Sequence, residues 1–108
     1  MANTFTSYVS RNVGTSPATI VTVAAATQTT VIGMTVANTS ASDITVDVYI
    51  TRSATDYYLV KGALVPTGKT FVPVGGDQKV VLIASDVLKV VSSAATSADV
   101  ITSVLNIT

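Results

Sequence analysis

The chain has 108 residues, with six Lys and Arg against six Asp, and a single domain near electrical neutrality is expected from this length and balance. Charged residues make up 11%, below the usual share of about 25%, while apolar residues reach 48%, which excludes a disordered chain. The chain also lacks the excess of basic residues that neutralises phosphates, which disfavours a nucleic-acid binder. The chain contains no His and no Cys, so imidazole catalysis, thiol nucleophiles, disulfides and His or Cys metal sites are excluded.

The N-terminal residues 1–7 have neither a basic start nor an apolar stretch, so we expect no signal peptide. The longest purely apolar run covers residues 80–84, far short of the roughly 18 residues that a membrane helix needs. We therefore expect a water-soluble protein that binds no membrane.

Residues with a branched Cβ dominate the chain, because Val, Ile and Thr together supply 44 positions and favour pleated sheet over helix. Residues 1–14 are polar and weakly patterned, and we expect them to form an N-terminal arm or a weak edge strand over 4–13. The remaining strands are expected at 18–25, 30–38, 43–52, 56–61, 69–74, 78–84, 86–92 and 98–107.

The clearest strand is 43–52, where apolar and polar residues alternate strictly, as in a sheet with one face in the core and one in water. Turn signals recur about every 8 to 12 residues, which is typical of a sandwich or barrel. The sequence therefore predicts an all-β fold: a single-domain antiparallel β-sandwich, Ig-like or jelly-roll-like, of about eight strands over residues 15–108.

A short echo occurs where Asp43, Asp86 and Asp99 each directly precede a β-branched run. An Asp side chain at such a position accepts a hydrogen bond from a nearby backbone N–H and sets the turn into the strand. Six Asp residues also suggest a calcium site, but they are scattered and lack the close spacing that hard cations require. We therefore expect turn-capping and solvated roles for them, and no metal or cofactor.

The segment Thr67 to Thr70 reads TGKT, like the end of a phosphate-binding loop. That loop needs a Gly where Ala63 stands and a helix afterwards, whereas residues 71–74 read as a strand. The segment is interpreted as a turn. Asn38 and Asn106 begin glycosylation patterns, which carry little weight without a secretion signal.

Five aromatic residues are the candidates for an interface. Tyr57 and Tyr58 project to opposite faces of a strand, and Tyr49 is expected on a wetter face. Exposed Tyr side chains stack on sugars or lie in subunit interfaces, although they also simply cover their own sheet. Phe5 and Tyr8 add two aromatic rings from the N-terminal arm.

Several segments resemble small all-β virion structural proteins of tailed bacteriophages. They read VIGMTVANTS (31–40), ITVDVYI (44–50), DYYLVK (56–61), VGGDQKVVL (74–82) and DVLKV (86–90). The resemblance runs from about residue 15 to the C-terminus and implies assembly on the capsid, neck or tail in repeated copies. It carries over no catalytic residue.

We therefore expect a non-enzymatic protein of the virion, assembled in the bacterial host cytoplasm, that decorates or cements the capsid in many symmetric copies. A neck or tail component, such as a collar or fibre attachment, is the alternative within this class. The expected partners are the chain itself and virion proteins such as the major capsid protein, with no nucleic acid. From another class, a carbohydrate-binding module would use Tyr49, Tyr57 or Tyr58 as a stacking platform.

Overall fold

The computed structural model describes residues 2–75 and 78–108, and these residues form nine β-strands and no helix, which confirms the expected all-β class. No helix in the described part of the chain is long and apolar enough to cross a membrane. The strands are β1 (Asn3–Val13), β2 (Ala18–Thr22), β3 (Gln28–Asn38), β4 (Ile44–Arg52), β5 (Thr55–Val65), β6 (Thr70–Val74), β7 (Val80–Leu82), β8 (Val87–Ser92) and β9 (Ala98–Ile107).

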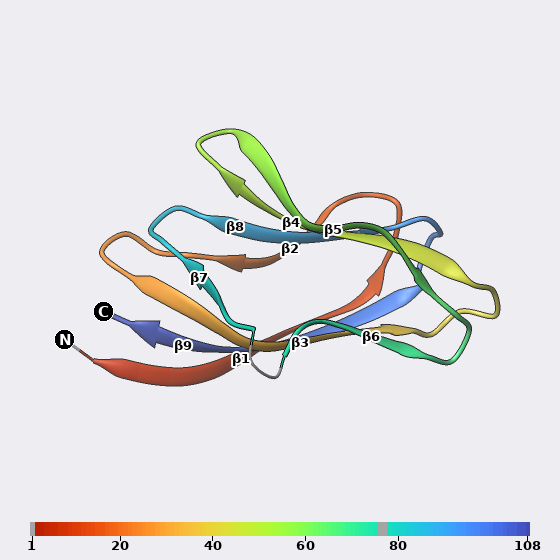
Figure 1. Ribbon diagram of the computed structural model, residues 1–108, viewed down its shortest axis with the longest axis horizontal. Helices are drawn as coiled ribbons and strands as arrows, with labels where there is room; N and C mark the ends of the chain where they lie inside the picture. Colours follow the sequence, from red (N-terminus) through yellow and green to blue (C-terminus); the bar gives the residue numbers. More distant parts are fainter. Residues whose placement is uncertain (1, 76–77) are drawn as a thin grey trace.

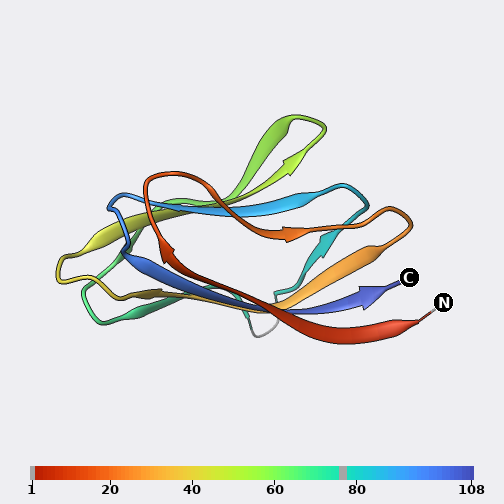
Figure 2. The same ribbon diagram turned by 180° about the vertical axis from the view of Figure 1, so that it is seen from behind.

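The strands form two antiparallel sheets that lie face to face as a sandwich (Figure 1). The first sheet has the order β1-β9-β3-β6, and β7 also pairs with β3. The second sheet has the order β2-β8-β4-β5. From β1 to β4 the chain alternates between the two sheets, and strands from its two ends, β1 and β9, lie side by side (Figure 2). This interleaved order is that of a jelly roll, which selects one of the two expected sandwich types.

The core lies between the inner faces of the two sheets and consists mostly of Val, with Met34, Ile44, Leu82 and Leu88 as its largest fully buried side chains. No aromatic ring is fully buried in it among the described residues, although Tyr8 and Phe71 pack against its rim. Branched side chains suit this arrangement because they lose little freedom on a pleated surface. The strict alternation expected over 43–52 is present in the first half of β4, where Ile44, Val46 and Val48 are buried.

The strand expected at 56–61 is wrong in its C-terminal bound, because β5 continues to Val65. Gly62 allows this with a φ of 71°, a left-handed conformation that residues with a Cβ adopt at a cost. Asp47 Oδ1 accepts a hydrogen bond of 2.7 Å from the Gly62 N–H, so the irregularity in the ladder is held from β4. Conversely, β2 ends at Thr22 and β7 covers three residues, shorter than expected.

The N-terminal segment expected as an arm or weak edge strand contains β1, which pairs with β9 along its length and forms one edge of the first sheet. The division into an arm over 1–14 and a sandwich over 15–108 stays a prediction. Only residue 75 of the turn expected at 75–77 is among the described residues, and Asp77 lies outside them.

The two-residue turn between β4 and β5 holds Ser53 and Ala54 in left-handed conformations, with φ of 51° and 63°. Arg52 and Thr55 pair on either side of it, so this is a tight hairpin. Positive φ at both central residues defines the turn type that Asn-Gly satisfies best. The tip of this hairpin stands away from the rest of the second sheet (Figure 1).

Replacing Ala54→Gly should therefore raise the free energy of unfolding by about 1 kcal/mol, because it removes the steric cost of a Cβ at positive φ. Urea denaturation followed by circular dichroism measures the change. Ala25→Gly is the matched control: Ala25 is an exposed loop residue without positive φ, so the added chain entropy should lower stability. A loss of stability in both variants would contradict the interpretation.

The Thr102 hydroxyl lies on the inner face of the first sheet, where it is fully buried and has no hydrogen-bond partner within the described part of the chain. Thr102→Val keeps the shape and removes the cost of burying that group. We expect the free energy of unfolding to rise by about 1 kcal/mol. The exposed Thr45→Val on β4 is the control and should change it by less than roughly 0.5 kcal/mol.

Candidate functional site

The carboxylates that the structure describes bond to other parts of the fold and do not gather into a site. Among the described residues there is no group of three or more Asp side chains that could hold a metal ion. Asp43 accepts a hydrogen bond from the Thr67 N–H, and Asp99 accepts one from the Asn12 N–H, each at 3.0 Å. These bonds confirm that the echoed Asp residues accept backbone N–H groups, but the donors come from distant segments.

Asp86 has the expected local bond, since its Oδ2 accepts a hydrogen bond of 2.9 Å from the Ile83 N–H. It also forms a bidentate ion pair with Arg52, whose Nε and Nη2 donate to its two oxygens at 2.8 Å and 2.6 Å. The Arg52 hydrogen bonds lower the pKa of the Asp86 carboxyl against the opposing effect of burial, and the Ile83 N–H adds to the lowering. This ion pair ties the β4–β5 hairpin to the turn before β8.

The polar sequence motifs are also structural. Residues 67–69 of the TGKT segment lie in the β5–β6 turn, with Gly68 at a φ of 72°, and Thr70 begins strand β6 where a phosphate-binding loop needs a helix. Asn38 is buried, and its side-chain amide donates to the Ser42 and Val65 carbonyls at 2.8 Å and 2.9 Å. An amide so engaged is not available for glycosylation in the folded chain.

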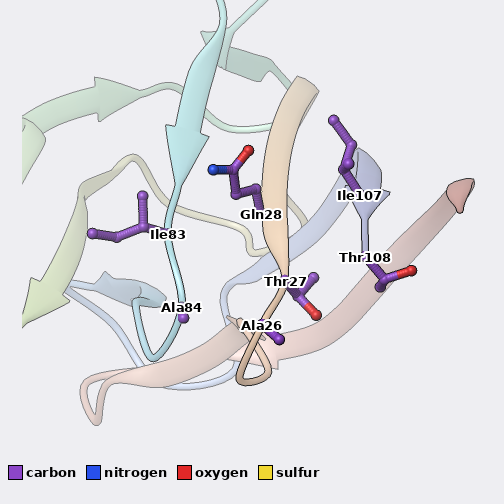
Figure 3. A pocket seen from close by; sticks show the side chains of 7 residues that line it. All are labelled: Ala26, Thr27, Gln28, Ile83, Ala84, Ile107 and Thr108. Carbon is purple, nitrogen blue, oxygen red and sulfur yellow. The ribbon is translucent and has the colours of Figure 1, made fainter. Parts of the chain in front are cut away.

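A hollow of about 520 Å³ opens at the end of the sandwich where β9 ends (Figure 3). Residues from the β2–β3 loop, the segment after β7 and the end of β9 line it. The lining side chains are Ala26, Thr27, Gln28, Ile83, Ala84, Ile107 and Thr108. None of these side chains ionises, so they offer neither an acid and base pair nor a charged anchor for a substrate.

Three of the candidate interface residues lie on the β4–β5 hairpin. Tyr49 lies on the outer face of the second sheet as expected, but it is only 6% exposed because Tyr58 covers it, with ring centroids 4.9 Å apart. Burial raises the pKa of the Tyr49 hydroxyl, and Asp56 adds to this effect. The Lys61 ammonium lies 4.5 Å from the centre of the Tyr58 ring.

Tyr57 is 57% exposed and lies on the opposite face of the hairpin from Tyr58, which is 45% exposed. Tyr57 pairs with Ile50 across the hairpin and, with Ile50 and Arg52, lines a shallow hollow of about 270 Å³. Because the hairpin tip stands away from the body, the ring that faces inward is left open to solvent. Tyr57 is therefore the hairpin tyrosine with the most accessible ring.

The other two candidates lie on β1. Phe5 is 75% exposed on the outer face of the first sheet, whereas Tyr8 is half-buried on the inner face. The structure thus divides the five candidates between two separate places, the hairpin and the edge strand. Their role as an interface stays a prediction.

Sequence reasoning missed an exposed apolar row on the outer face of the first sheet. Val9 is 74% exposed and pairs with the exposed Ile101 on β9, while Phe5 pairs with the half-buried Leu105. Alternation signals a buried face only when the other face is polar, and β9 carries apolar residues on both faces. The signal was therefore present in the sequence but did not show which row faces water.

No protein-family model matches the chain, and no curated protein sequence matches it. A solved structure of Bacillus endospore appendages, described as disulfide-linked pili, aligns with 99% of this chain and 87% of its own, at 14% identity and a TM-score of 0.58. A structure of the T13 viral particle of IBDV aligns with 96% of this chain at 13% identity and a TM-score of 0.50. This chain spans only 35% of that viral chain. At these identities the likeness shows a shared fold.

The Asp86 ion pair generates a pH prediction. The unfolded Asp86 carboxyl titrates near its ordinary pKa of 3.8 and the folded one lower, so its stabilisation is present above pH 3.8 and is lost as the pH falls through the lower folded value. Asp86→Asn should lower Tm at pH 7, and the difference in Tm between this variant and the unmodified chain should become smaller below pH 3.8. Differential scanning calorimetry at a series of pH values measures this difference. The exposed Asp56→Asn is the control, and its difference in Tm at pH 7 should be smaller. A difference for Asp86→Asn that does not change with pH would contradict the assignment.

Proposed function

We propose that this protein is a non-enzymatic structural subunit of a multi-copy assembly. The observation that carries the proposal is the long, open edge of β1 beside an exposed apolar row, on a chain with few charges to keep copies apart. The described carboxylates are engaged in holding the fold, and the hollow at the end of the sandwich has no ionisable side chain. These features favour contact between protomers over chemistry on a small molecule.

Within this function, we propose a place in the virion of a tailed bacteriophage, as a protein that decorates or cements the capsid. The support is the resemblance of segments between residues 31 and 90, together with a jelly-roll order that also builds viral capsid domains. A neck or tail component uses the same contacts in fewer copies. The endospore appendages are described as disulfide-linked pili, and the residues of this chain cannot form such links because they include no Cys.

The physical mechanism is burial of apolar and hydroxyl-rich surface where protomers meet. Each contact need not be strong, because a copy held by several neighbours dissociates only when all of its contacts open together. Assembly in turn stabilises each folded protomer by mass action. The hairpin Tyr57 and the outer face of β1 supply two contact surfaces on different sheets, as a repeated lattice requires.

A carbohydrate-binding function has less support in the geometry. A sugar stacks on a ring face that is open to solvent, but Tyr49 is buried and the Tyr58 ring contacts both Tyr49 and Lys61. Tyr57 alone among the hairpin tyrosines keeps an accessible ring without such a contact, and one ring is a small platform.

Purified protein should self-associate as its concentration rises, forming species larger than a dimer. Size-exclusion chromatography with light scattering measures the mass, and electron microscopy shows whether the assemblies are ordered. A persistent monomer or a dimer that never grows would contradict assembly by the chain alone. For the finer proposal, a map of the native particle should show hundreds of copies on the shell, and a small ring at one vertex would instead support the neck or tail.

A further inference from the structure

The hydrogen bonds at the start of β1 determine which of its backbone groups face the open edge. Ala2 and Thr108 exchange both of their backbone N–H···O bonds, at 3.1 Å and 2.9 Å. The register with β9 then continues without a shift as far as Ser10. In an antiparallel ladder, residues alternate between pairs that exchange hydrogen bonds and pairs that do not. Thr4, Thr6, Tyr8 and Ser10 therefore bond to β9.

The alternate residues of β1, namely Asn3, Phe5, Ser7 and Val9, direct their backbone N–H and C=O groups away from β9. No strand follows β1 in the order of the first sheet within the described part of the chain, so these groups lie at an open edge. The same residues carry their side chains on the outer face of the sheet, where Phe5 and Val9 are exposed. This edge therefore offers a row of unpaired backbone groups flanked by apolar side chains.

The other sheet edges of the chain are less suited to pairing with β1. The β5 edge has two register shifts against β4, and β2 has five residues with a shift of its own. On the far side of the first sheet, β6 contains Pro73, which cannot donate a backbone hydrogen bond, and β7 has three residues. A long regular ladder needs a partner of equal regularity, and on this chain the matching strand is β1 itself.

We propose that β1 of one copy pairs antiparallel with β1 of a second copy, about a twofold axis at Ser7. The proposal rests on the assembly function proposed above and names one of its contacts. In this register Ser7 lies opposite Ser7 of the second copy, and Phe5 lies opposite Val9 of the second copy. Each of these pairs exchanges two backbone hydrogen bonds. The first sheets of the two copies then become one continuous sheet.

This register is favoured because it matches apolar side chains on the outer face and brings no like charges together. On the outer face it extends the row from Leu105 through Phe5 to Val9 and Ile101 of the second copy, since the pairs Phe5–Leu105 and Val9–Ile101 already exist within each copy. Aromatic and β-branched residues in such cross-strand pairs stabilise a sheet. The only charged side chain of β1 is Arg11 near its end, which lies opposite Asn3 of the second copy, so no like charges meet.

A disulfide trap tests the register directly, because the chain has no Cys of its own. Residues in a hydrogen-bonded pair have Cα atoms about 5.5 Å apart, within the range that a disulfide spans. Ser7→Cys should therefore give a covalent dimer as the main product of mild oxidation, measured on a non-reducing gel. Ser103→Cys is the matched control: Ser103 is exposed on β9 directly beside Ser7, but one strand further from the axis, and it should stay uncrosslinked.

A second pair of variants tests the same edge without a covalent bond. Val9→Lys places a charge on the proposed contact and should raise the dimer dissociation constant about tenfold or more, measured by sedimentation velocity. Val81→Lys is the control, since Val81 is similarly exposed on the same sheet but lies on β7, away from β1. It should leave dimerisation unchanged, and at concentrations where the unmodified chain is monomeric both variants should keep its Tm.

The outcomes separate this contact from the assembly function. A Ser7→Cys dimer that never grows beyond two copies supports the β1 contact and overturns assembly by the chain alone. Large assemblies in which Ser7→Cys does not crosslink, or crosslinks no more than Ser103→Cys, overturn the β1 contact and leave the assembly function standing. Equal effects of Val9→Lys and Val81→Lys also overturn the β1 contact.

Discussion

Burial of two valine-rich sheet faces against each other is the interaction on which the fold depends. The chain has no disulfide, and the part that the structure describes has no metal cluster and no fully buried aromatic ring in the core, so stability rests on close packing of many small branched side chains. Polar bonds then fix loops around that core. The Arg52–Asp86 pair ties the β4–β5 hairpin to the turn before β8, and Asn38 ties the loop after β3 to the end of β5.

This use of the polar residues also bears on function. The five Asp side chains that the structure describes, a residue type that elsewhere serves as general acid or metal ligand, are here engaged by backbone N–H groups, a hydroxyl or a guanidinium. The exposed surface includes the open side of β1, the row that includes Phe5 and Val9, and the Tyr57 ring on the projecting hairpin. These are the features by which protein subunits recognise one another, and they are distributed over both sheets.

Much of the fold was predictable because β-branched residues and turn signals act locally. The all-β class, the sandwich and the approximate positions of most strands followed from them. The end of β5 did not, because continuing the strand past Gly62 depends on a bond from Asp47, fifteen residues away. Strand order was also beyond a sequence argument, since it arises from contacts between the two ends of the chain. The same limit applies to the candidate surface. Tyr49 was correctly placed on an outer face, but its burial depends on Tyr58 across the hairpin. The exposed row of β9 was missed because this strand carries apolar residues on both faces.

The position of β9 between β1 and β3 has a consequence for biosynthesis. Among the nine described strands β9 is made after the other eight, yet without it the first sheet has a gap between β1 and β3. A nascent chain therefore cannot complete its sandwich until β9 has left the ribosome, and until then β1 and β3 each lack their shared neighbour. Such a chain, dominated by contacts between distant residues, is expected to fold slowly. During that interval it is most exposed to premature association with other nascent copies.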